Sequence, residues 1–547
     1  MSQGSLTRRR TWLLFAMLLS IHIRVGAEEQ LPTFEGLNRV IDFGDWNKAR
    51  TLCNEIFQKN PENADALVAR ARLRSLTGKT SEAISDCDRV LSSSPGYPIA
   101  LNTRGIILCT TGNPKAGRND LKMYLELTNS AKDTVTRFHR ALAYESLEDF
   151  KTAKNEWQII LKDTASATSP EHQYIRGLAQ SHLEMFDYAT ETLTKLRQKH
   201  TVAPQLLSLL AHCHSELLMS ELSLKEFAEV AQQEPDYFVN QGAWARALLK
   251  LKRYDEAIKH YDKALQIEEH YADALYHRGH CFSMLRKYDS AVKDYSKVLL
   301  LEPDNYAAYF SRAHAYSSLG QEKEAAEDWK RQTLLNPKDL NSWFELCNSL
   351  TLLQQWKDAY VAINQALNLS PKWDIALCMR ASLEGKMGNY DKAVAHYADA
   401  IRIHPKSSTV YYSRGMFFRN EKQYAKSIAD FTKAIKLDPK DAINYCARGC
   451  AEVRNHNHRE AIADCTKSIQ LNPKRTHPYL SRGEAYSALG KYYLALRDLN
   501  RVVAKDDKLL IEALTERAKV YQKMNKKSLA NSDIDRIKQK QLSKQKV

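Results

Sequence analysis

The sequence predicts an all-α protein, a solenoid built from repeated helix-turn-helix units. Two observations predict this class. Apolar residues recur at helical spacing in two short sets per unit, and the whole pattern then returns at a constant interval along the chain. Proline marks the end of successive units at Pro303, Pro337, Pro371, Pro405, Pro439 and Pro473. A fixed period of this length is typical of solenoids, in which each unit buries its apolar face against its neighbours.

One unit runs from Ala272, taken as position 1, to Asn305 at position 34. Its apolar or small residues fall at positions 3, 4, 8, 10 and 11, and again at positions 17, 20, 21, 24, 27 and 28. The polar pair Arg286 and Lys287 separates the two sets, so we expect a turn between two helices there. The proline after the second set ends the second helix. Small residues at positions 8 and 20 let the two backbones approach closely.

This pattern resembles the tetratricopeptide repeat, in which an aromatic residue precedes Leu-Gly-x-x-Tyr, followed by Ala-x-x-x-Phe and a proline. The matching residues include Trp343, Gly279, Tyr316, Ala325, Tyr295 and Pro337. The resemblance is to the repeat class and not to one protein, and Arg commonly replaces Leu at position 7. It implies a right-handed superhelix whose inner groove holds peptides.

Residues 1–27 are predicted to be a signal peptide. A basic run, Arg8 to Arg10, precedes an apolar stretch from Thr11 to Ile23 that is too short to span a bilayer. Small residues up to Ala27 suit cleavage, with Glu28 starting the mature chain. The alternatives are an uncleaved anchor or a chance apolar N-terminus. No second long apolar run follows, so no transmembrane segment is expected in the mature chain.

The repeats cover nearly the whole mature chain. About six irregular units are expected in residues 28–237, eight regular units in residues 238–509, and a final unit with a basic capping helix in residues 510–547. The capping helix, from Ile534 onward, is interpreted as the solubilising end that solenoids require. A lysine-rich tail that binds membrane or nucleic acid is the alternative. No room is left for a second globular domain.

Charge and cysteine content add few functional signals. The formal net charge is +15, but basic residues form no dense stripe with interleaved aromatics, so nucleic acid is not an expected partner. Ten cysteines are present. Six of them fall at core positions of the repeat, where a free thiol acts as a small apolar side chain: Cys53, Cys87, Cys213, Cys281, Cys347 and Cys465.

A cluster of cysteine and histidine suggests zinc by composition alone. It comprises Cys446, Cys450, His456, His458 and Cys465. However, helical geometry turns Cys446 and Cys450 away from Cys465, and the two histidines fall in the turn between helices. The sequence therefore predicts no metal and no cofactor.

Arginine recurs at position 7, and aspartate follows sixteen residues later in the same units. Position 7 points away from the groove face, so these pairs are interpreted as structural bridges between the two helices of one unit. A row of ligand-binding arginines is the alternative. As exposed pairs, each bridge would contribute about 0–1 kcal/mol. The pairs are Arg70–Asp86, Arg104–Asp120, Arg278–Asp294, Arg312–Asp328, Arg414–Asp430, Arg448–Asp464, Arg482–Asp498 and Arg517–Asp533.

The groove face is predicted from the helical angle of about 100° per residue. With position 8 toward the core, positions 2, 5, 9, 12 and 13 lie on one side, which the resemblance assigns to the inner groove. Position 5 is mostly aromatic in five successive units, and position 9 beside it is mostly polar. Tyrosine at position 5 also occurs in ordinary repeats of this family. The predicted peptide-binding residues are Tyr276, His280, Phe310, His314, Phe344, Asn348, Tyr412 and Met416. No three consecutive units reproduce the family's clamp for chaperone tails.

These features favour a non-catalytic protein that binds other proteins or unfolded polypeptide segments, either chaperone-like or an adaptor in the secretory pathway. The arrangement is similar to the endoplasmic-reticulum co-chaperone with a J domain, but the chain lacks a His-Pro-Asp motif. It ends Lys-Gln-Lys-Val, without a retention signal, so both the endoplasmic-reticulum lumen and secretion stay open.

The alternative function is a cytoplasmic scaffold that assembles a multiprotein complex. The sequon at Asn368 can distinguish the secretory protein from the cytoplasmic scaffold, because a glycan there requires lumenal exposure. No phosphate loop, nucleophile elbow or convincing metal set points to an enzyme. The sequence does not indicate an oligomeric state.

Overall fold

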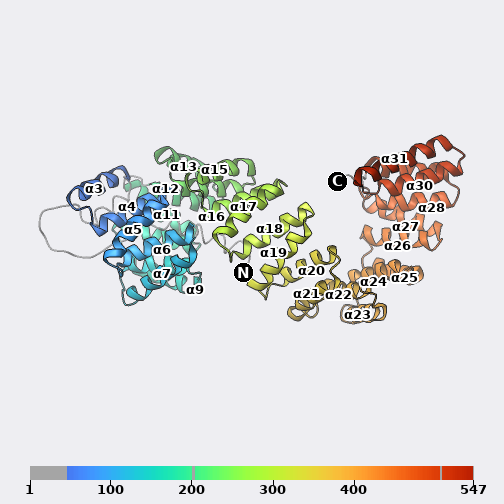
Figure 1. The fold of residues 1–547 in the computed structure, drawn as a ribbon, viewed down its shortest axis with the longest axis horizontal. Helices are drawn as coiled ribbons and strands as arrows, with labels where there is room; N and C mark the ends of the chain where they lie inside the picture. Colours follow the sequence, from blue (N-terminus) through green and yellow to red (C-terminus); the bar gives the residue numbers. More distant parts are fainter. Residues whose placement is uncertain (1–45, 112, 200–203, 506–507, 546–547) are drawn as a thin grey trace. The chain divides into compact units, whose positions relative to one another are not determined.

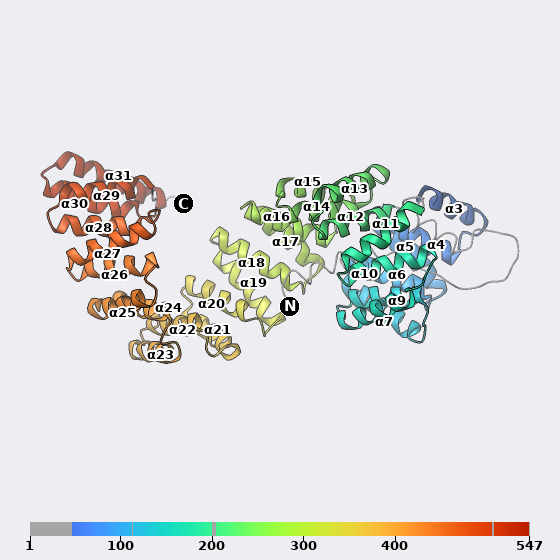
Figure 2. The same cartoon turned by 180° about the vertical axis from the view of Figure 1, so that it is seen from behind.

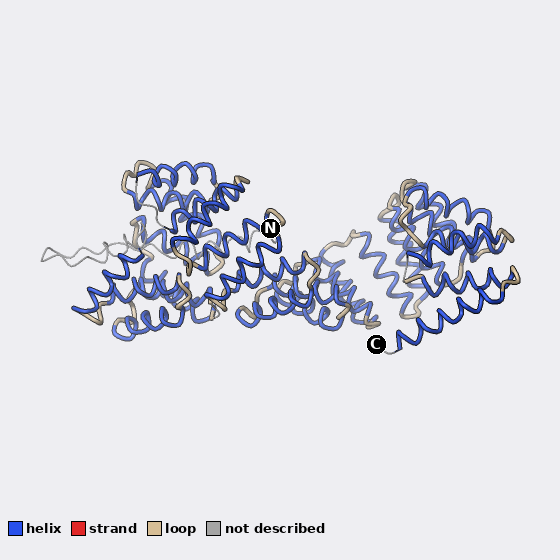
Figure 3. Tube along the Cα trace, turned by 90° about the horizontal axis from the view of Figure 1, so that it is seen from above, coloured by secondary structure: helices blue, strands red, loops and turns tan. Residues whose placement is uncertain are grey.

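The computed structural model describes residues 46–111, 113–199, 204–505 and 508–545. Over these ranges the chain is helical with short connecting turns and contains no strand, as Figure 3 shows. The predicted all-α solenoid of helix-turn-helix units is confirmed. The predicted signal peptide lies outside the described residues. No described helix combines the length and the apolar character needed to cross a membrane.

The chain divides into two compact units, with the boundary between Asn336 and Pro337. Unit 1 ends at Asn336, and unit 2 begins at Pro337. In both units, most helices form antiparallel pairs along the sequence, one pair per repeat (Figure 1).

Unit 1 begins, within the described residues, with the second helix of the first repeat, α3 (Trp46–Lys59). Eight helix pairs follow along the chain: α4 (Ala64–Leu76) with α5 (Thr80–Ser93), α6 (Pro98–Thr110) with α7 (Pro114–Thr128), α8 (Thr134–Ser146) with α9 (Phe150–Asp163), α10 (Pro170–His182) with α11 (Phe186–Lys199), α12 (Pro204–Glu216) with α13 (Ser220–Gln233), α14 (Phe238–Lys250) with α15 (Tyr254–Ile267), α16 (Ala272–Met284) with α17 (Tyr288–Leu301), and α18 (Tyr306–Leu319) with α19 (Glu322–Leu335).

Unit 2 contains six pairs within the described residues: α20 (Leu340–Leu352) with α21 (Trp356–Leu369), α22 (Asp374–Lys386) with α23 (Tyr390–Ile403), α24 (Ser408–Asn420) with α25 (Tyr424–Leu437), α26 (Ala442–Arg454) with α27 (His458–Leu471), α28 (His477–Ala488) with α29 (Tyr492–Lys505), and α30 (Leu510–Lys523) with α31 (Lys527–Gln545). The predicted basic cap is continuous with α31 instead of forming a separate helix. Ile534 and Ile537 are half-buried there, and Leu542 is exposed.

The turn within most described pairs has a left-handed residue at position 15. Arg286 has φ of 59° there, directly between α16 and α17, where the sequence predicts the turn. Glycine adopts this conformation without the steric cost that a side chain brings, and it occupies the position in four of the described repeats: Gly78, Gly320, Gly388 and Gly490.

The two helices of a repeat approach most closely at position 8. A methyl group placed on Gly279 would lie 2.9 Å from Cε1 of Tyr295 on the partner helix. In α6 and α7, Gly117 stands where most repeats have alanine, and a methyl group there would lie 2.5 Å from the backbone oxygen of Gly105. The third repeat therefore needs glycine on both helices.

Unit 1 has contacts that a linear array of repeats does not require. The ring of Trp46 packs edge-on against Tyr237 with centroids 5.2 Å apart, and Arg50 pairs with Glu234 at 3.4 Å. Thr80 also donates a hydrogen bond to Glu268. Figures 1 and 2 show the blue first helices beside the green ones. The first repeats thus pack against repeats that are distant in the sequence, so stability in unit 1 is not confined to neighbouring repeats.

The eight predicted arginine–aspartate bridges are all present. In each, the guanidinium donates two hydrogen bonds of 2.5–3.0 Å to the carboxylate of the second helix. The expected contribution of about 0–1 kcal/mol applies to exposed pairs, and that premise is wrong here. The aspartate side chains are only 3–12% exposed, because the paired helices cover them.

Candidate peptide-binding surfaces

The first helix of each repeat presents positions 5 and 9 one turn apart on the same face. The predicted aromatic side chains at position 5 are half-buried: Tyr276, Phe310, Phe344 and Tyr412. At position 9, His280 and His314 are exposed, whereas Asn348 and Met416 are half-buried. Each aromatic ring is therefore partly packed in the core and partly accessible. This placement is compatible both with core packing and with binding.

In unit 1, the aromatic residues of α16 and α18 are braced by neighbours. Tyr276 OH lies 3.2 Å from Ser311 Oγ, and burial raises the pKa of this phenol. Phe310 packs edge-on against Trp329 of the second helix, with centroids 5.2 Å apart. The exposed His314 contacts both rings, at 4.5 Å and 4.9 Å. These rings have little freedom to move, which lowers the entropic cost of binding.

In unit 2, the predicted residues of α20 are Phe344 and Asn348. They line none of the cavities described here. Phe344 packs on Trp373, with ring centroids 4.8 Å apart. The amide of Asn348 donates to Glu345 of the same helix at 3.3 Å. Both side chains are thus engaged locally.

A cavity of about 290 Å³ lies between α22 and α24 in unit 2. Its lining includes the predicted Tyr412 and Met416 together with Cys378 and Ser382, the residues at positions 5 and 9 of the preceding repeat. Positions 2 and 13 of both repeats also line it. The lining residues at these positions are Ile375, Cys378, Ser382, Lys386, Thr409, Tyr412, Met416 and Asn420.

The walls of this cavity are mainly apolar. Tyr397 and Phe417 form its aromatic side, with ring centroids 5.5 Å apart. Burial raises the pKa of Cys378 to about 11, so the thiol is neutral near pH 7 and adds no charge. Lys386 and Glu421 supply one charge of each sign at the edge. Such a surface suits a partly apolar side chain with polar backbone beside it.

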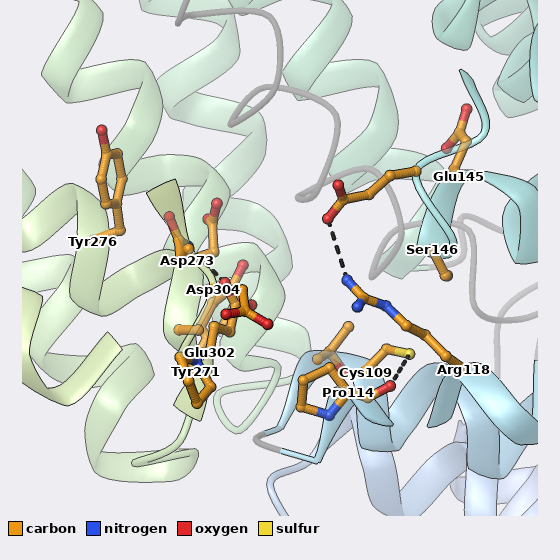
Figure 4. A pocket seen from close by; sticks show the side chains of 15 residues that line it. Cys109, Pro114, Arg118, Glu145, Ser146, Tyr271, Asp273, Tyr276, Glu302 and Asp304 are labelled. Atoms are coloured by element: carbon orange, nitrogen blue, oxygen red, sulfur yellow. Dashed lines mark hydrogen bonds and ion pairs between the residues drawn. The ribbon is translucent and has the colours of Figure 1, made fainter. Parts of the chain in front are cut away.

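A second cavity of about 310 Å³ lies inside unit 1 (Figure 4). Arg118, Glu145 and Ser146 border one side, and Tyr271, Asp273 and Tyr276 border the other. Of the predicted residues, only Tyr276 reaches it. Carboxylates outnumber the single guanidinium in its lining, which makes the cavity acidic. The carboxylates are Glu145, Glu148, Asp273, Glu302 and Asp304.

Several of these acidic residues have neighbours that hold them in place. Glu148 pairs with Arg118 at 3.5 Å, and Glu145 accepts a hydrogen bond of 2.8 Å from the indole of Trp157. Asp273 pairs with Arg246. The sequence pattern does not indicate this cavity, because its two sides come from repeats that are far apart along the chain. The repeat period describes contacts between neighbouring units and does not predict such a contact.

The sulfur-rich cluster differs from the one considered in the sequence. Cys446 and Cys450 lie together on α26, and His477 joins them from the start of α28. The two thiols and an imidazole nitrogen all lie within 4.8 Å of one another. His456 lies in the turn before α27, as predicted, whereas His458 is the first residue of that helix and not part of the turn. The signal that could have found His477 is its position 2 in the next repeat, on the same face as positions 5 and 9.

Comparison with known proteins identifies the class of the chain. Sequence profiles described as tetratricopeptide repeat match residues 38–98, 272–305, 306–339 and 378–442, and a profile described as TPR repeat matches residues 245–285. Two of the matches have the bounds of successive units counted from Ala272. The chain belongs to the tetratricopeptide-repeat superfamily.

Several solved structures are similar to this chain at low identity. Yeast Tom70 is 16% identical with a TM-score of 0.41, covering 81% of this chain and 99% of that chain. Cut9–Hcn1, described as an APC/C hetero-tetramer, is 14% identical with a TM-score of 0.34, covering 84% and 96%. YrrB, described as a TPR protein with an unusual peptide-binding site, is 20% identical with a TM-score of 0.32, covering 34% and 97%. A comparison with curated proteins finds no match.

Proposed function

We propose that this protein is a non-catalytic binding protein that holds extended polypeptide on the inner faces of its repeats, as a chaperone-like protein or adaptor of the secretory pathway. Tetratricopeptide repeats form protein–protein interaction scaffolds, and the cavity between α22 and α24 carries the finer proposal. Its lining comes from the same positions of two successive repeats. An extended segment that crosses these repeats would pass positions 2, 5, 9 and 13 of each repeat in turn.

The chemistry of the cavity favours unfolded, partly apolar polypeptide. Tyr412 and Met416 offer polarisable surface, and Ser382 offers a hydroxyl for a peptide group. About 290 Å³ accommodates side chains but not a folded domain. Selectivity would come from the spacing of side chains along the segment, not from one charged anchor.

The secretory location rests on the N-terminal sequence and on the sequon at Asn368. This asparagine is exposed in the last turn of α21, which leaves room for a glycan. To test it, the full chain with a C-terminal tag is expressed in cells, and its N-terminus and glycosidase sensitivity are determined. We expect a chain that begins near Glu28 and loses a glycan on digestion. An intact, unglycosylated chain in the cytosol would overturn the secretory proposal and favour the cytoplasmic scaffold.

Binding is tested with a reduced, carboxymethylated polypeptide that cannot fold. The variants Ser382→Arg and Thr409→Arg place a long charged side chain in the cavity without removing a buried ring. We expect each to weaken binding at least about tenfold, equivalent to about 1.4 kcal/mol. A separate variant tests the aromatic face. It combines Tyr276→Ala, Phe310→Ala and Phe344→Ala in one chain.

Matched controls come from exposed apolar residues of the second helices. Leu300 and Tyr493 are 80% and 78% exposed, and neither lines a described cavity. Leu300→Ala and Tyr493→Ala should therefore bind like the unchanged protein. Equal binding by the cavity variants and these controls would contradict the proposed groove.

A further inference from the structure

Two cysteines and one histidine come together in unit 2, outside the cavity between α22 and α24. Cys446 and Cys450 are four residues apart on α26, so their side chains project from the same face one turn apart. His477 approaches them from the first turn of α28. Within the described residues, this is the one set of three or more such ligands whose donor atoms come this close together.

The spacing of these atoms is close to what a metal ion needs. All three donor atoms lie within 4.8 Å of one another. A tetrahedral zinc ion with Zn–S bonds of about 2.3 Å holds two sulfurs about 3.8 Å apart. Small rotations of the side chains close that difference, because His477 is exposed and Cys450 is only partly buried.

A neighbouring hydroxyl holds the Cys450 side chain in place. Ser481 Oγ lies 3.1 Å from the Cys450 sulfur. Such a contact orients a metal ligand from the outer shell.

We propose that Cys446, Cys450 and His477 form a binding site for a zinc ion. Two sulfurs and one imidazole nitrogen match the ligand preference of zinc, and three protein ligands leave a fourth position for water or a partner group. With both thiols ionised, the two negative charges balance the charge of the ion. The ion would join α26 to α28, two consecutive first helices of the solenoid.

The site is tested by titrating the full reduced chain with zinc chloride against a chromogenic chelator. We expect one zinc ion that is lost or bound at least about 100-fold more weakly in Cys450→Ser and His477→Gln, since outer-shell changes alone cost about 10–100-fold. Cobalt should give near-ultraviolet thiolate bands that both variants abolish. His456→Gln is the matched control, because this exposed histidine of the next turn should leave affinity unchanged.

His477→Gln keeps the test valid if a cysteine variant unfolds, because the histidine is exposed. Zinc uptake that is equal in the unchanged chain and in His477→Gln would overturn the proposal. A disulfide between Cys446 and Cys450 in the chain recovered from cells would overturn it as well, since oxidised cysteines cannot act as thiolate ligands. The outcome is independent of polypeptide binding, which is measured separately.

Discussion

Arg278 lies between two carboxylates, that of Asp294 in its own repeat and that of Asp262 in the preceding repeat. Its Nη2 atom is 2.7 Å from Asp294 Oδ1, and its Nη1 atom is 2.7 Å from Asp262 Oδ1. The Asp294 side chain is 5% exposed, whereas that of Asp262 is 45% exposed. One guanidinium therefore joins the second helices of two successive repeats and satisfies a buried carboxylate. This supports a structural role for the arginine at position 7.

Removing this arginine should destabilise unit 1. Arg278→Met would leave Asp294 buried without its counter-ion, which we expect to cost about 3 kcal/mol. Arg278→Met combined with Asp294→Leu should recover most of the loss, because the lone buried carboxylate is then gone. Urea unfolding followed by circular dichroism measures both changes. A single variant no less stable than the original would contradict a structural bridge.

Arg414 provides the matched comparison in unit 2. It bonds Asp430 in the same way, but the residue sixteen positions earlier is Ala398, which offers no acceptor side chain. Arg414→Met should therefore cost less than Arg278→Met, by about 0.5–1 kcal/mol for the missing exposed pair. Equal losses would show that the link to Asp262 contributes nothing.

The third repeat should not tolerate a side chain at Gly117. The new methyl group of Gly117→Ala would lie 2.5 Å from Gly105 O and 2.8 Å from Cys109 N, both backbone atoms that cannot rotate away. We expect a loss of about 1–3 kcal/mol from the forced separation of α6 and α7. Gly96→Ala is the control, because its nearest neighbour, a Leu127 methyl, is 4.0 Å away. Thermal unfolding of both variants checks the contrast, and equal melting temperatures would refute it.

The contact between Trp46 and Tyr237 should couple distant repeats of unit 1. Trp46→Ala removes a side chain that is only 1% exposed, at a cost of about 3–5 kcal/mol. Hydrogen exchange should then quicken in residues 234–268 as well as in the first repeats. Trp157 is equally buried but packs on Phe138 of its own repeat and on His182 of the next repeat. Trp157→Ala should therefore leave residues 234–268 protected from hydrogen exchange. If Trp46→Ala quickens exchange in the first repeats alone, the proposed coupling is disproved.

Glu484 should make unit 2 less stable as the pH rises. Burial raises the pKa of this carboxyl from 4.5 to about 7. The positive charge of Arg454 lowers the pKa, although not enough to cancel the effect of burial. Glu516 and Cys450 raise the pKa further, and Lys519 lowers it. The folded chain holds the proton more tightly than the unfolded chain. The contribution of Glu484 to stability is therefore fully present below about pH 4.5 and is lost as the pH rises through about 7, by up to about 3 kcal/mol.

Glu484→Gln should flatten this pH dependence, because the amide does not titrate. Urea unfolding at pH 5 and pH 8, with a chelator present so that metal binding does not contribute, measures the difference. Glu516→Gln is the control that changes a neighbouring charge on α30 and keeps the buried carboxyl. An unchanged slope in Glu484→Gln would show that other groups cause the pH dependence.

The regular repeats could be predicted because their physical determinants are local in the sequence. The turn at Arg286, the helix end before Pro303 and the close approach at Gly279 each follow from residues within one period. The arginine–aspartate bridges were equally predictable, since a fixed separation of sixteen residues places both side chains between the same two helices. The burial of the aspartates was not predictable, because it depends on how closely the paired helices cover them, which the spacing does not specify.

The candidate sites divide in the same way. The helical angle assigned positions 2, 5, 9 and 13 to one face, and these positions line the cavity beside Tyr412. That Phe344 packs on Trp373 instead of lining a cavity depends on rotamers, which the period does not specify. His477 was missed because it belongs to the repeat after that of Cys450, beyond the short stretch of cysteine and histidine that suggested a metal.

The sequence by itself determined the class of protein and the repeat frame, because helix periodicity and nearest-neighbour packing act within one repeat and its immediate neighbours. Only the tertiary structure decided which repeats meet at a distance, such as Trp46 with Tyr237, and which polar side chains share a cavity or could share a metal ion. Those outcomes depend on the small rotation from each repeat to the next, summed over many repeats. The sequence of a single repeat does not specify this cumulative rotation.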